Sequence, residues 1–308
     1  MYRTISLVIP PAATDGLVTQ LKALPGVVGL AVHPGASLKP EGDQLVVESL
    51  NTAADDILEL ARTAGGPDLS VTTAEASSLT DRSAQHLIDA DRDEAVWEEM
   101  EARLLQEGRA TPNFLALTAF GGAVAVAGLV SDPVPQAIAI VSASVIAPGF
   151  EPLAKVPLGA VLGRWGVAFK GLLSAAVGYA VLILAAGLTL WALLAAGAVS
   201  ADQFAGNPQV QRLSSISAVD LVVSAGGALA GMTMVAAFRH DVLSGALIAL
   251  MLVPAAAVVG GAVAVGQMDL AMAAVQRAGV DVALMVAAGL LVFGAKRVTT
   301  HRRPSLRA

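Results

Sequence analysis

The sequence predicts a polytopic α-helical membrane protein that carries a small soluble α+β domain at its N-terminus. Of the 308 residues, 55% are hydrophobic and only 14% are charged, and the mean hydropathy is +0.69. This composition is typical of membrane proteins. Roughly six apolar stretches long enough to cross a bilayer follow residue 111. Cysteine is absent, which excludes disulfides and thiolate chemistry.

The charge distribution divides the chain. Residues 1–110 hold 18 acidic and 8 basic residues, a net charge of −10, whereas residues 111–308 hold 7 acidic and 11 basic residues, a net charge of +4. We expect no cleaved signal peptide, because no basic segment precedes a long apolar one near the start. The expected parts are a ferredoxin-like cytoplasmic domain over 1–78, an acidic linker helix over 79–110, a transmembrane domain over 111–298 and a basic cytoplasmic tail over 299–308.

The first part reads as alternating strands and helices. Hydrophobic alternation predicts strands over Arg3–Pro10, Gly26–Val32, Gln44–Leu50 and Asp68–Ala74. Apolar residues at helical spacing predict helices over Thr14–Leu24 and 51–66. The order βαββαβ is that of the ferredoxin-like split βαβ unit. Such domains regulate or oligomerise, and the fold alone does not decide which.

The linker is expected to be a single acidic helix over Thr80–Arg109. Its broken apolar stripe is predicted to pack on the small domain or on a neighbouring subunit, and consists of Leu87, Val96, Trp97, Met100, Leu104 and Leu105. His86, Asp89 and Asp93 share helical spacing, which raises a divalent metal as one interpretation. A charge run on a helix is more often a solvated face, so we expect no metal site, and no cofactor is predicted.

The apolar region is predicted to cross the membrane about six times. The spans are Pro112–Val130, Val134–Leu153, Gly171–Val199, Ala218–Phe238, Val242–Val265 and Val280–Ala295. Basic residues concentrate on one set of connections and in the tail: Lys155, Arg164, Lys170, Arg239, Lys296, Arg297, Arg302, Arg303 and Arg307. The opposite connections carry only Arg212 and Arg277. The positive-inside rule therefore predicts that both termini are cytoplasmic.

The stretch ASVIAPGFEPLAKVP, residues 143–157, interrupts the second span. The segment from Val134 to Ala147 has only 14 residues, about 21 Å of helix, whereas the hydrocarbon core is about 30 Å thick. Pro148 and Glu151 are thus expected within the membrane or at its inner edge. Two interpretations remain: the helix simply ends at Ala147, or it is broken and lines a wet cavity.

An internal similarity favours the broken helix. Residues 121–148 and 226–254 both begin with GGA, turn once through a short polar connection and end at a proline. We infer two inverted three-helix repeats with proline-broken helices, the arrangement in which secondary transporters bind solutes. Chance similarity between two Ala/Gly-rich helices is the alternative.

These patterns predict which residues form the site. Transport-path candidates are Ser142, Ser144, Pro148, Glu151, Pro152, Lys155 and Pro254, and helix-packing candidates are Gly121, Gly122, Gly226 and Gly227. Glu151 is the expected ion ligand or proton-coupling group, unless Lys155 neutralises it as a local ion pair. Asp220, Asp241 and Asp281 lie near the ends of expected spans, where capping or snorkelling accounts for them.

Three segments resemble a known family. VSASVIAPGFEPLAKVPLG, DLVVSAGGALAGMTMVAAF and LSGALIALMLVPAAAVVGG are similar to the domain-of-unknown-function 389 family of hydrophobic bacterial and archaeal proteins. The resemblance extends over most of residues 111–295. The chain departs from the family pattern at Ser144, where the family has Met, and at Ala255, where it often has a second proline after Pro254. The resemblance implies a fold more than an activity.

The expected function is membrane transport, by a channel or secondary transporter, of an unidentified ion or small solute. The soluble domain would regulate it or assemble subunits. The alternative is a non-transporting membrane sensor or scaffold. An enzyme is not expected, because none of the four histidines lies in a predicted span and no hydrolase or phosphate-loop motif occurs. Expected partners are the lipid bilayer of a prokaryotic inner membrane, the solute and further copies of the chain, but not nucleic acid.

Overall fold

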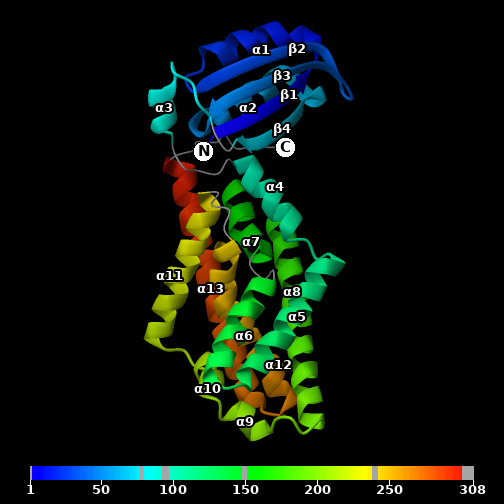
Figure 1. The fold of residues 1–308 in the computed structure, drawn as a ribbon, viewed down its shortest axis with the longest axis vertical. Coiled ribbons are helices and arrows are strands. Elements are labelled where there is room, and N and C mark those ends of the chain that lie inside the picture. Colours follow the sequence, from blue (N-terminus) through cyan, green and yellow to red (C-terminus); the bar gives the residue numbers. More distant parts are fainter. Residues whose placement is uncertain (1, 77–78, 92–96, 148–150, 238–241, 300–308) are drawn as a thin grey trace. The chain divides into compact units, whose positions relative to one another are not determined.

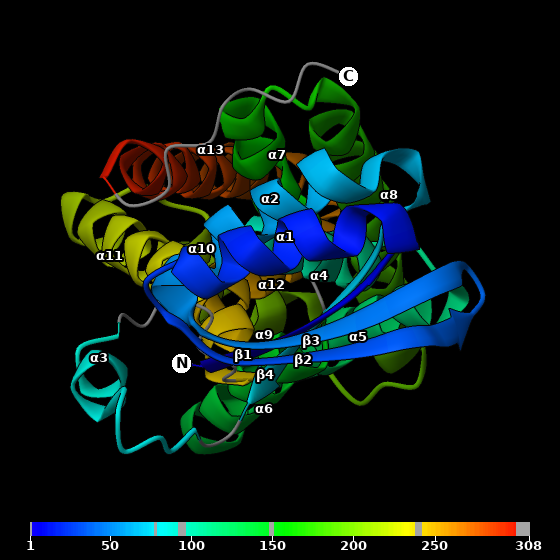
Figure 2. The same cartoon turned by 90° about the horizontal axis from the view of Figure 1, so that it is seen from above.

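The chain forms two compact units, Met1–Met100 and Glu101–Ala308, called here the N-terminal unit and the helical unit. The computed structural model describes residues 2–76, 79–91, 97–147, 151–237 and 242–299. Each unit is treated by itself, and both are drawn in Figures 1 and 2.

The N-terminal unit contains a four-stranded antiparallel sheet in the order β2-β3-β1-β4. Its elements are β1 (Tyr2–Ile9), α1 (Pro11–Ala23), β2 (Val27–Leu38), β3 (Glu41–Leu50), α2 (Ala54–Gly65) and β4 (Ser70–Ala76), with short 3₁₀ turns at Asn51–Ala53 and Gly66–Asp68. This is the βαββαβ order expected from the sequence, with β1 and β3 as central strands. The boundaries differ mainly at β2, which runs six residues beyond the expected strand end at Val32.

The core of this unit lies between the sheet and its two helices, which cover one face (Figure 2). Burial alternates along β1, so that Ile5, Leu7 and Ile9 point into the core while their neighbours face the other side. Leu17 of α1 and Ile57 of α2 are fully buried opposite them. Buried residues recur every second position in β1 and every third or fourth position in α1 and α2. This difference in period is why the hydrophobic pattern alone identified both kinds of element.

The expected single linker helix is wrong: the described part of this region contains two helices, α3 (Gln85–Asp89) and α4 (Trp97–Glu107). The helix α3 ends before Asp91, whose carboxylate accepts hydrogen bonds from the backbone amides of Asn51 at 2.9 Å and Thr52 at 3.3 Å. These two amides belong to the first turn of a 3₁₀ helix and need an acceptor. Asp91, two residues beyond the end of α3, provides that acceptor.

Besides the larger part of α4, the described part of the helical unit contains nine helices (Figure 1). They are α5 (Pro112–Leu129), α6 (Pro133–Ile146), α7 (Glu151–Leu162), α8 (Trp165–Ala195), α9 (Ala201–Ala205), α10 (Pro208–Leu213), α11 (Ala218–Ala236), α12 (Val242–Ala264) and α13 (Met268–Thr299). Side-chain caps from Thr111, Ser200, Asn207 and Ser217 begin α5, α9, α10 and α11. These caps satisfy amide groups that have no partner within the helix.

Four of these helices are long and apolar enough to cross a membrane: α5, α8, α11 and α13. The pair α6 and α7 makes a fifth if the two are one bent span, and the Leu252–Ala264 part of α12 is a shorter apolar helix. Two of the expected spans begin later in the sequence than the helices that contain them. The helix α8 begins at Trp165 rather than Gly171, and α13 begins at Met268 rather than Val280.

The outer surface of the helical unit is apolar. Seven large hydrophobic side chains of α8 are more than half exposed: Trp165, Phe169, Leu172, Leu173, Leu184, Leu188 and Trp191. On α11 the same holds for Val219, Val222 and Val223. Contiguous exposed apolar surface of this kind is unfavourable in water and favourable in lipid. The helical unit is therefore suited to a membrane.

Asp43 gives the N-terminal unit a predicted pH dependence. Its carboxylate accepts hydrogen bonds from Thr14 Oγ1 at 2.7 Å and from the Gly35 amide at 2.8 Å. The Thr14 bond, followed by the Gly35 bond, lowers the pKa of Asp43 below its ordinary value of 3.8. A pKa lower in the folded state means that the stabilisation is complete above the ordinary pKa and is lost as the pH falls through the folded value.

We expect Asp43→Asn to increase hydrogen exchange several-fold in peptides from β2 and β3 at about pH 7, because the hydrogen bonds to a charged acceptor are lost. The difference between wild type and variant should shrink as the pH falls below about 4. Mass spectrometry of the full-length protein would measure both at matched pH. Asp15→Asn changes an exposed carboxylate of α1 and is the control. Equal protection of the Asp43 variant and wild type at about pH 7 would contradict the prediction.

Candidate functional site in the helical unit

The second expected span is interrupted. The helix α6 ends at Ile146, α7 begins at Glu151, and their axes are bent by 50°. Pro148 lies outside the described residues. The sequence did not predict that α7 continues to Leu162, through Pro152 and Pro157, both of which are buried. Pro152 occupies the first turn, where no intrahelical amide is required, so a helix beginning at Glu151 is compatible with the proline.

The two candidate serines lie in the last turns of α6. Ser144 is buried, and its hydroxyl donates a hydrogen bond to the carbonyl of Ile140 at 2.9 Å. Ser142 is only partly buried. A hydroxyl bonded to the carbonyl four residues earlier is satisfied within its own helix and bends it slightly. Ser144 therefore has a local role in α6, and its oxygen keeps acceptor capacity for a further donor.

Lys155 lies inside the helical unit, with only 2% of its surface exposed. Its Nζ donates a hydrogen bond to the carbonyl of Gly108 at 2.6 Å. Glu151 lies one helical turn earlier on α7, at the i, i+4 spacing that places two side chains on the same face. The local pair of Lys155 with Glu151 stays a prediction. The hydrogen bond to Gly108, 47 residues away, is a contact that the sequence did not indicate.

Two glycines make room for Lys155. A Cβ at Gly171 of α8 would lie 2.6 Å from both the Lys155 Cβ and the Pro152 carbonyl oxygen. A Cβ at Gly108 would lie 2.6 Å from the Lys155 Cε. Real Cβ atoms do not approach other atoms so closely, so Gly171, which faces the backbone of α7, is required for α7 to pack where it does. A side chain at position 108 would displace the end of the Lys155 side chain. The buried cation is therefore built into the backbone packing around it.

A small cavity lies next to the start of α7. Its volume is about 10 Å³, and it is lined by Phe114, Thr118, Pro152, Ala175, Gly178, Tyr179 and Leu182. This is the space of about one water molecule. The Thr118 hydroxyl is bonded to the Phe114 carbonyl at 2.7 Å, so its proton is not offered to the cavity. Of the expected transport-path residues, Pro152 lines this cavity.

The expected helix break at Pro254 is absent. Pro254 is buried in the interior of α12, which is continuous from Val242 to Ala264. Proline removes one amide donor and leaves the carbonyl four residues earlier, that of Leu250, without its usual partner. Such a proline is tolerated in a helix that is packed by neighbours on all sides, and Val253, Ala255 and Ala256 beside it are buried as well. Pro254 thus does not interrupt its helix, whereas the second expected span is interrupted between Ile146 and Glu151.

The four helix-packing glycines also differ. A Cβ at Gly121 would lie 2.5 Å from the Ala147 Cβ, and one at Gly122 would lie 2.4 Å from the Leu182 carbonyl oxygen. These two residues allow α5 to approach α6 and α8. At Gly226 a Cβ would meet nothing within 4 Å, so no close approach occurs there. Gly227 is partly buried on α11.

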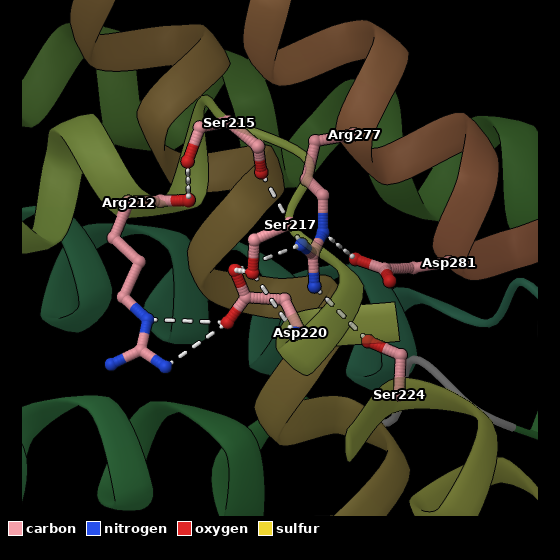
Figure 3. A network of polar contacts seen from close by, with 7 residues as sticks. All are labelled: Arg212, Ser215, Ser217, Asp220, Ser224, Arg277 and Asp281. Carbon is pink, nitrogen blue, oxygen red and sulfur yellow. Dashed lines mark hydrogen bonds and ion pairs between the residues drawn. The ribbon is translucent and has the colours of Figure 1, made fainter. Parts of the chain in front are cut away.

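A second polar cluster joins α10, α11 and α13 (Figure 3). The guanidinium of Arg277 donates to Asp281 Oδ2 at 3.0 Å, to Ser224 Oγ at 3.1 Å and to the Ser215 carbonyl at 3.3 Å. It also forms an ion pair with Asp220 Oδ2 at 3.7 Å. Arg212 donates to Asp220 Oδ1 from two nitrogens, at 3.1 and 3.2 Å. The cluster therefore alternates two arginines with two aspartates.

Asp220 lies at the start of α11 as expected, but the cap is Ser217, whose hydroxyl accepts a hydrogen bond from the Asp220 amide at 3.1 Å. A capping role is wrong for Asp281. Asp281, by contrast, lies in the interior of α13 with 3% of its side chain exposed, because α13 begins twelve residues before the expected span. Asp241 lies outside the described residues. The i, i+4 pair of Arg277 and Asp281 is the sequence signal that could have identified this cluster.

A metal site is not found among the described residues: no group of three or more potential ligands converges there. His86 and Asp89 lie on α3, whereas Asp93 lies outside the described residues. The polar groups of the helical unit that are well placed are thus carboxylates, arginines, a lysine and hydroxyls.

Apolar outer surfaces, helices of spanning length and a buried polar interior define a membrane-embedded helical protein with an additional small α+β unit. The family model described as "Domain of unknown function (DUF389)" matches residues 144–287 of this chain. The match confirms the resemblance inferred from the sequence, and it includes Glu151, Lys155 and the whole cluster around Arg277. No curated protein and no solved structure matches the chain.

The close packing at Gly122 can be tested by comparing an alanine substitution there with one at Gly226. We expect Gly122→Ala to destabilise the helical unit by about 1–3 kcal/mol, because the added methyl group would meet the carbonyl of Leu182 and force α5 and α8 apart. The measurement is the unfolding of the purified protein in one detergent.

Gly226→Ala is the control, since its methyl group would meet open space and alanine is the better helix former by up to about 1 kcal/mol. Equal destabilisation by the two changes would contradict the packing assigned to Gly122.

Proposed function

We propose that this protein transports an ion or small solute across the inner membrane of a prokaryote, as a channel or secondary transporter. The six crossings of this proposal are α5, the bent pair α6–α7, α8, α11, α12 and α13. The N-terminal unit is a cytoplasmic regulatory or oligomerising domain in a homo-oligomer. The observation that carries the proposal is the interrupted span, which begins again at Glu151 and buries Lys155 one turn later.

Burying charge in lipid is costly. Ionisable groups at membrane depth are unfavourable by several kcal/mol, and proteins that keep them generally use them for ion or solute movement. The interior of the helical unit holds Glu151 and Lys155 at the bend, and Arg277 and Asp281 on α13. An interrupted helix adds backbone groups that need partners, which are best provided around a polar path.

Charge asymmetry supports an orientation with both termini in the cytoplasm. Lys155, Arg164 and Lys170 follow the bend, and Lys296 and Arg297 end α13. Six crossings return the chain to the side on which it began, and the basic residues mark that side as cytoplasmic. The connection with α9 and α10 then faces the other side.

We also propose that the helical unit contains an inverted repeat. The first half would comprise α5, α6–α7 and α8, and the second α11, α12 and α13. Each half places an interrupted or proline-containing helix second, with Pro148 and Pro254 at corresponding sequence positions. The continuous α12 makes the two halves unequal, so that the bend in the first half is the site of solute binding.

A non-transporting sensor or scaffold is the second candidate. It is favoured by the small size of the cavity beside Pro152, about 10 Å³, and by the internal hydrogen bonds of Lys155 and Ser144. In this alternative the buried polar groups specify helix packing and no solute passes.

Flux through the purified protein in vesicles separates the two candidates. We expect wild type to conduct or exchange at least one species in a screen of common cations, anions and protons. Glu151→Gln should reduce that flux at least about tenfold, because a charged ligand is removed at constant side-chain size.

The control is Asp202→Asn, which changes an exposed carboxylate in α9. Absence of flux for every species in folded wild-type protein would favour the sensor or scaffold. Flux that is unchanged in a folded Glu151→Gln variant would remove Glu151 from the path.

A further inference from the structure

Asp281 holds a buried carboxylate oxygen with an unmet hydrogen-bonding need. One oxygen, Oδ2, accepts from Arg277 Nε at 3.0 Å. The other, Oδ1, is buried and, within the part of the chain that the structure describes, has no hydrogen-bond partner. Leaving a buried acceptor without a donor is costly, more so when it is charged. A proton bound to this oxygen removes the charge that makes the arrangement unfavourable.

The surroundings can accommodate a neutral Asp281. Arg277 keeps three other acceptors when Asp281 releases it: the Asp220 carboxylate, the Ser224 hydroxyl and the Ser215 carbonyl. The guanidinium is therefore not left as an isolated buried charge, which would be the main obstacle to breaking the pair. In Figure 3 Asp281 lies at one end of the cluster and Arg212 at the other.

The cluster also connects this oxygen to the surface. Side-chain exposure rises along it from 3% at Asp281 to 8% at Arg277, 12% at Asp220 and 61% at Arg212. Each neighbour in this series is linked to the next by an ion pair. The exposed end lies at α10 and the first turn of α11, so a row of polar groups extends from Asp281 to that surface.

Asp281 and Glu151 lie at similar depth. The helices α7 and α13 run side by side in the same direction, because Gly289 meets Pro157 and Arg297 bonds the carbonyl of Val161 further along both. Counting back from the contact of Gly289 with Pro157, Asp281 lies about 12 Å and Glu151 about 9 Å along their helices.

Among the described residues, the helices packed against α13 carry several charged groups. Next to Asp281 on its own helix is Arg277, α11 carries Asp220, α10 carries Arg212, and α7 carries Glu151 and Lys155. The sequence of α12, which packs against α13, contains no titratable residue.

We propose that Asp281 is a proton-binding site inside the membrane, loaded from the side that carries α9 and α10, and that protonation releases it from Arg277. The proton adds to a carboxylate oxygen, and the Asp281–Arg277 ion pair is replaced by the remaining contacts of Arg277. The protonation itself does not depend on transport. Only its use as a coupling step rests on the proposed function.

Infrared difference spectra of the full-length protein in lipid nanodiscs, recorded between about pH 8 and about pH 4, test the site without a flux assay. We expect a carbonyl stretch of a protonated, weakly solvated carboxylic acid that is present in wild type and missing in Asp281→Asn. The exposed Asp202→Asn variant should keep it.

Arg277→Gln provides a second readout that requires Asp281 to be intact. Removing the opposite charge favours the neutral carboxyl group, so the band should appear at higher pH than in wild type. A wild-type protein without the band, or a folded Asp281→Asn variant that retains it, would overturn the proposal. Loss of the band on adding Na⁺ at constant pH would assign the oxygen to an alkali cation and also overturn it.

Discussion

The helical unit depends on one constraint: charged and backbone polar groups in an apolar surrounding need partners within the protein. Three buried cationic side chains satisfy this constraint in the same way: each donates a hydrogen bond to a backbone carbonyl that lies far away in the sequence. Lys155 binds the carbonyl of Gly108 at 2.6 Å, Lys296 binds that of Ala236 at 2.8 Å, and Arg277 binds that of Ser215 at 3.3 Å. Each contact ties two segments that are far apart in sequence, so the positions of α7, α11 and α13 follow from where these carbonyls lie.

Small residues decide how closely the helices approach, and thereby whether such contacts form. At Gly260 of α12 a Cβ would lie only 2.1 Å from the Ile183 carbonyl of α8, and at Gly289 of α13 one would lie 2.4 Å from Pro157. Where lipid replaces water, the hydrophobic effect no longer drives helices together, and close packing between small residues takes its place. The alanine and glycine content is thus a structural requirement for a tight bundle with a polar interior.

The two carboxylates of the interior have different surroundings. Glu151 begins a helix at a bend, beside a cavity of about 10 Å³ lined by its neighbour Pro152. Asp281 lies within a continuous helix and is held by Arg277. Groups that are placed at similar depth with unequal partners are suited to hold charge or protons differently. This asymmetry gives the proposed transport function and the proposed proton site a common structural basis.

The sequence by itself determined the features that depend on local pattern. The alternation in Arg3–Pro10, the amphipathic helices of the N-terminal unit and the apolar length of α5, α8 and α11 follow from periodicity and composition. It also determined that the second span is interrupted near Pro148. Only the tertiary structure decided that α12 continues through Pro254, that α3 ends before Asp91, and that Asp281 is buried beside Arg277. These outcomes depend on groups far away in the chain, such as the amide of Asn51 and the hydroxyl of Ser224, whose proximity no local pattern encodes.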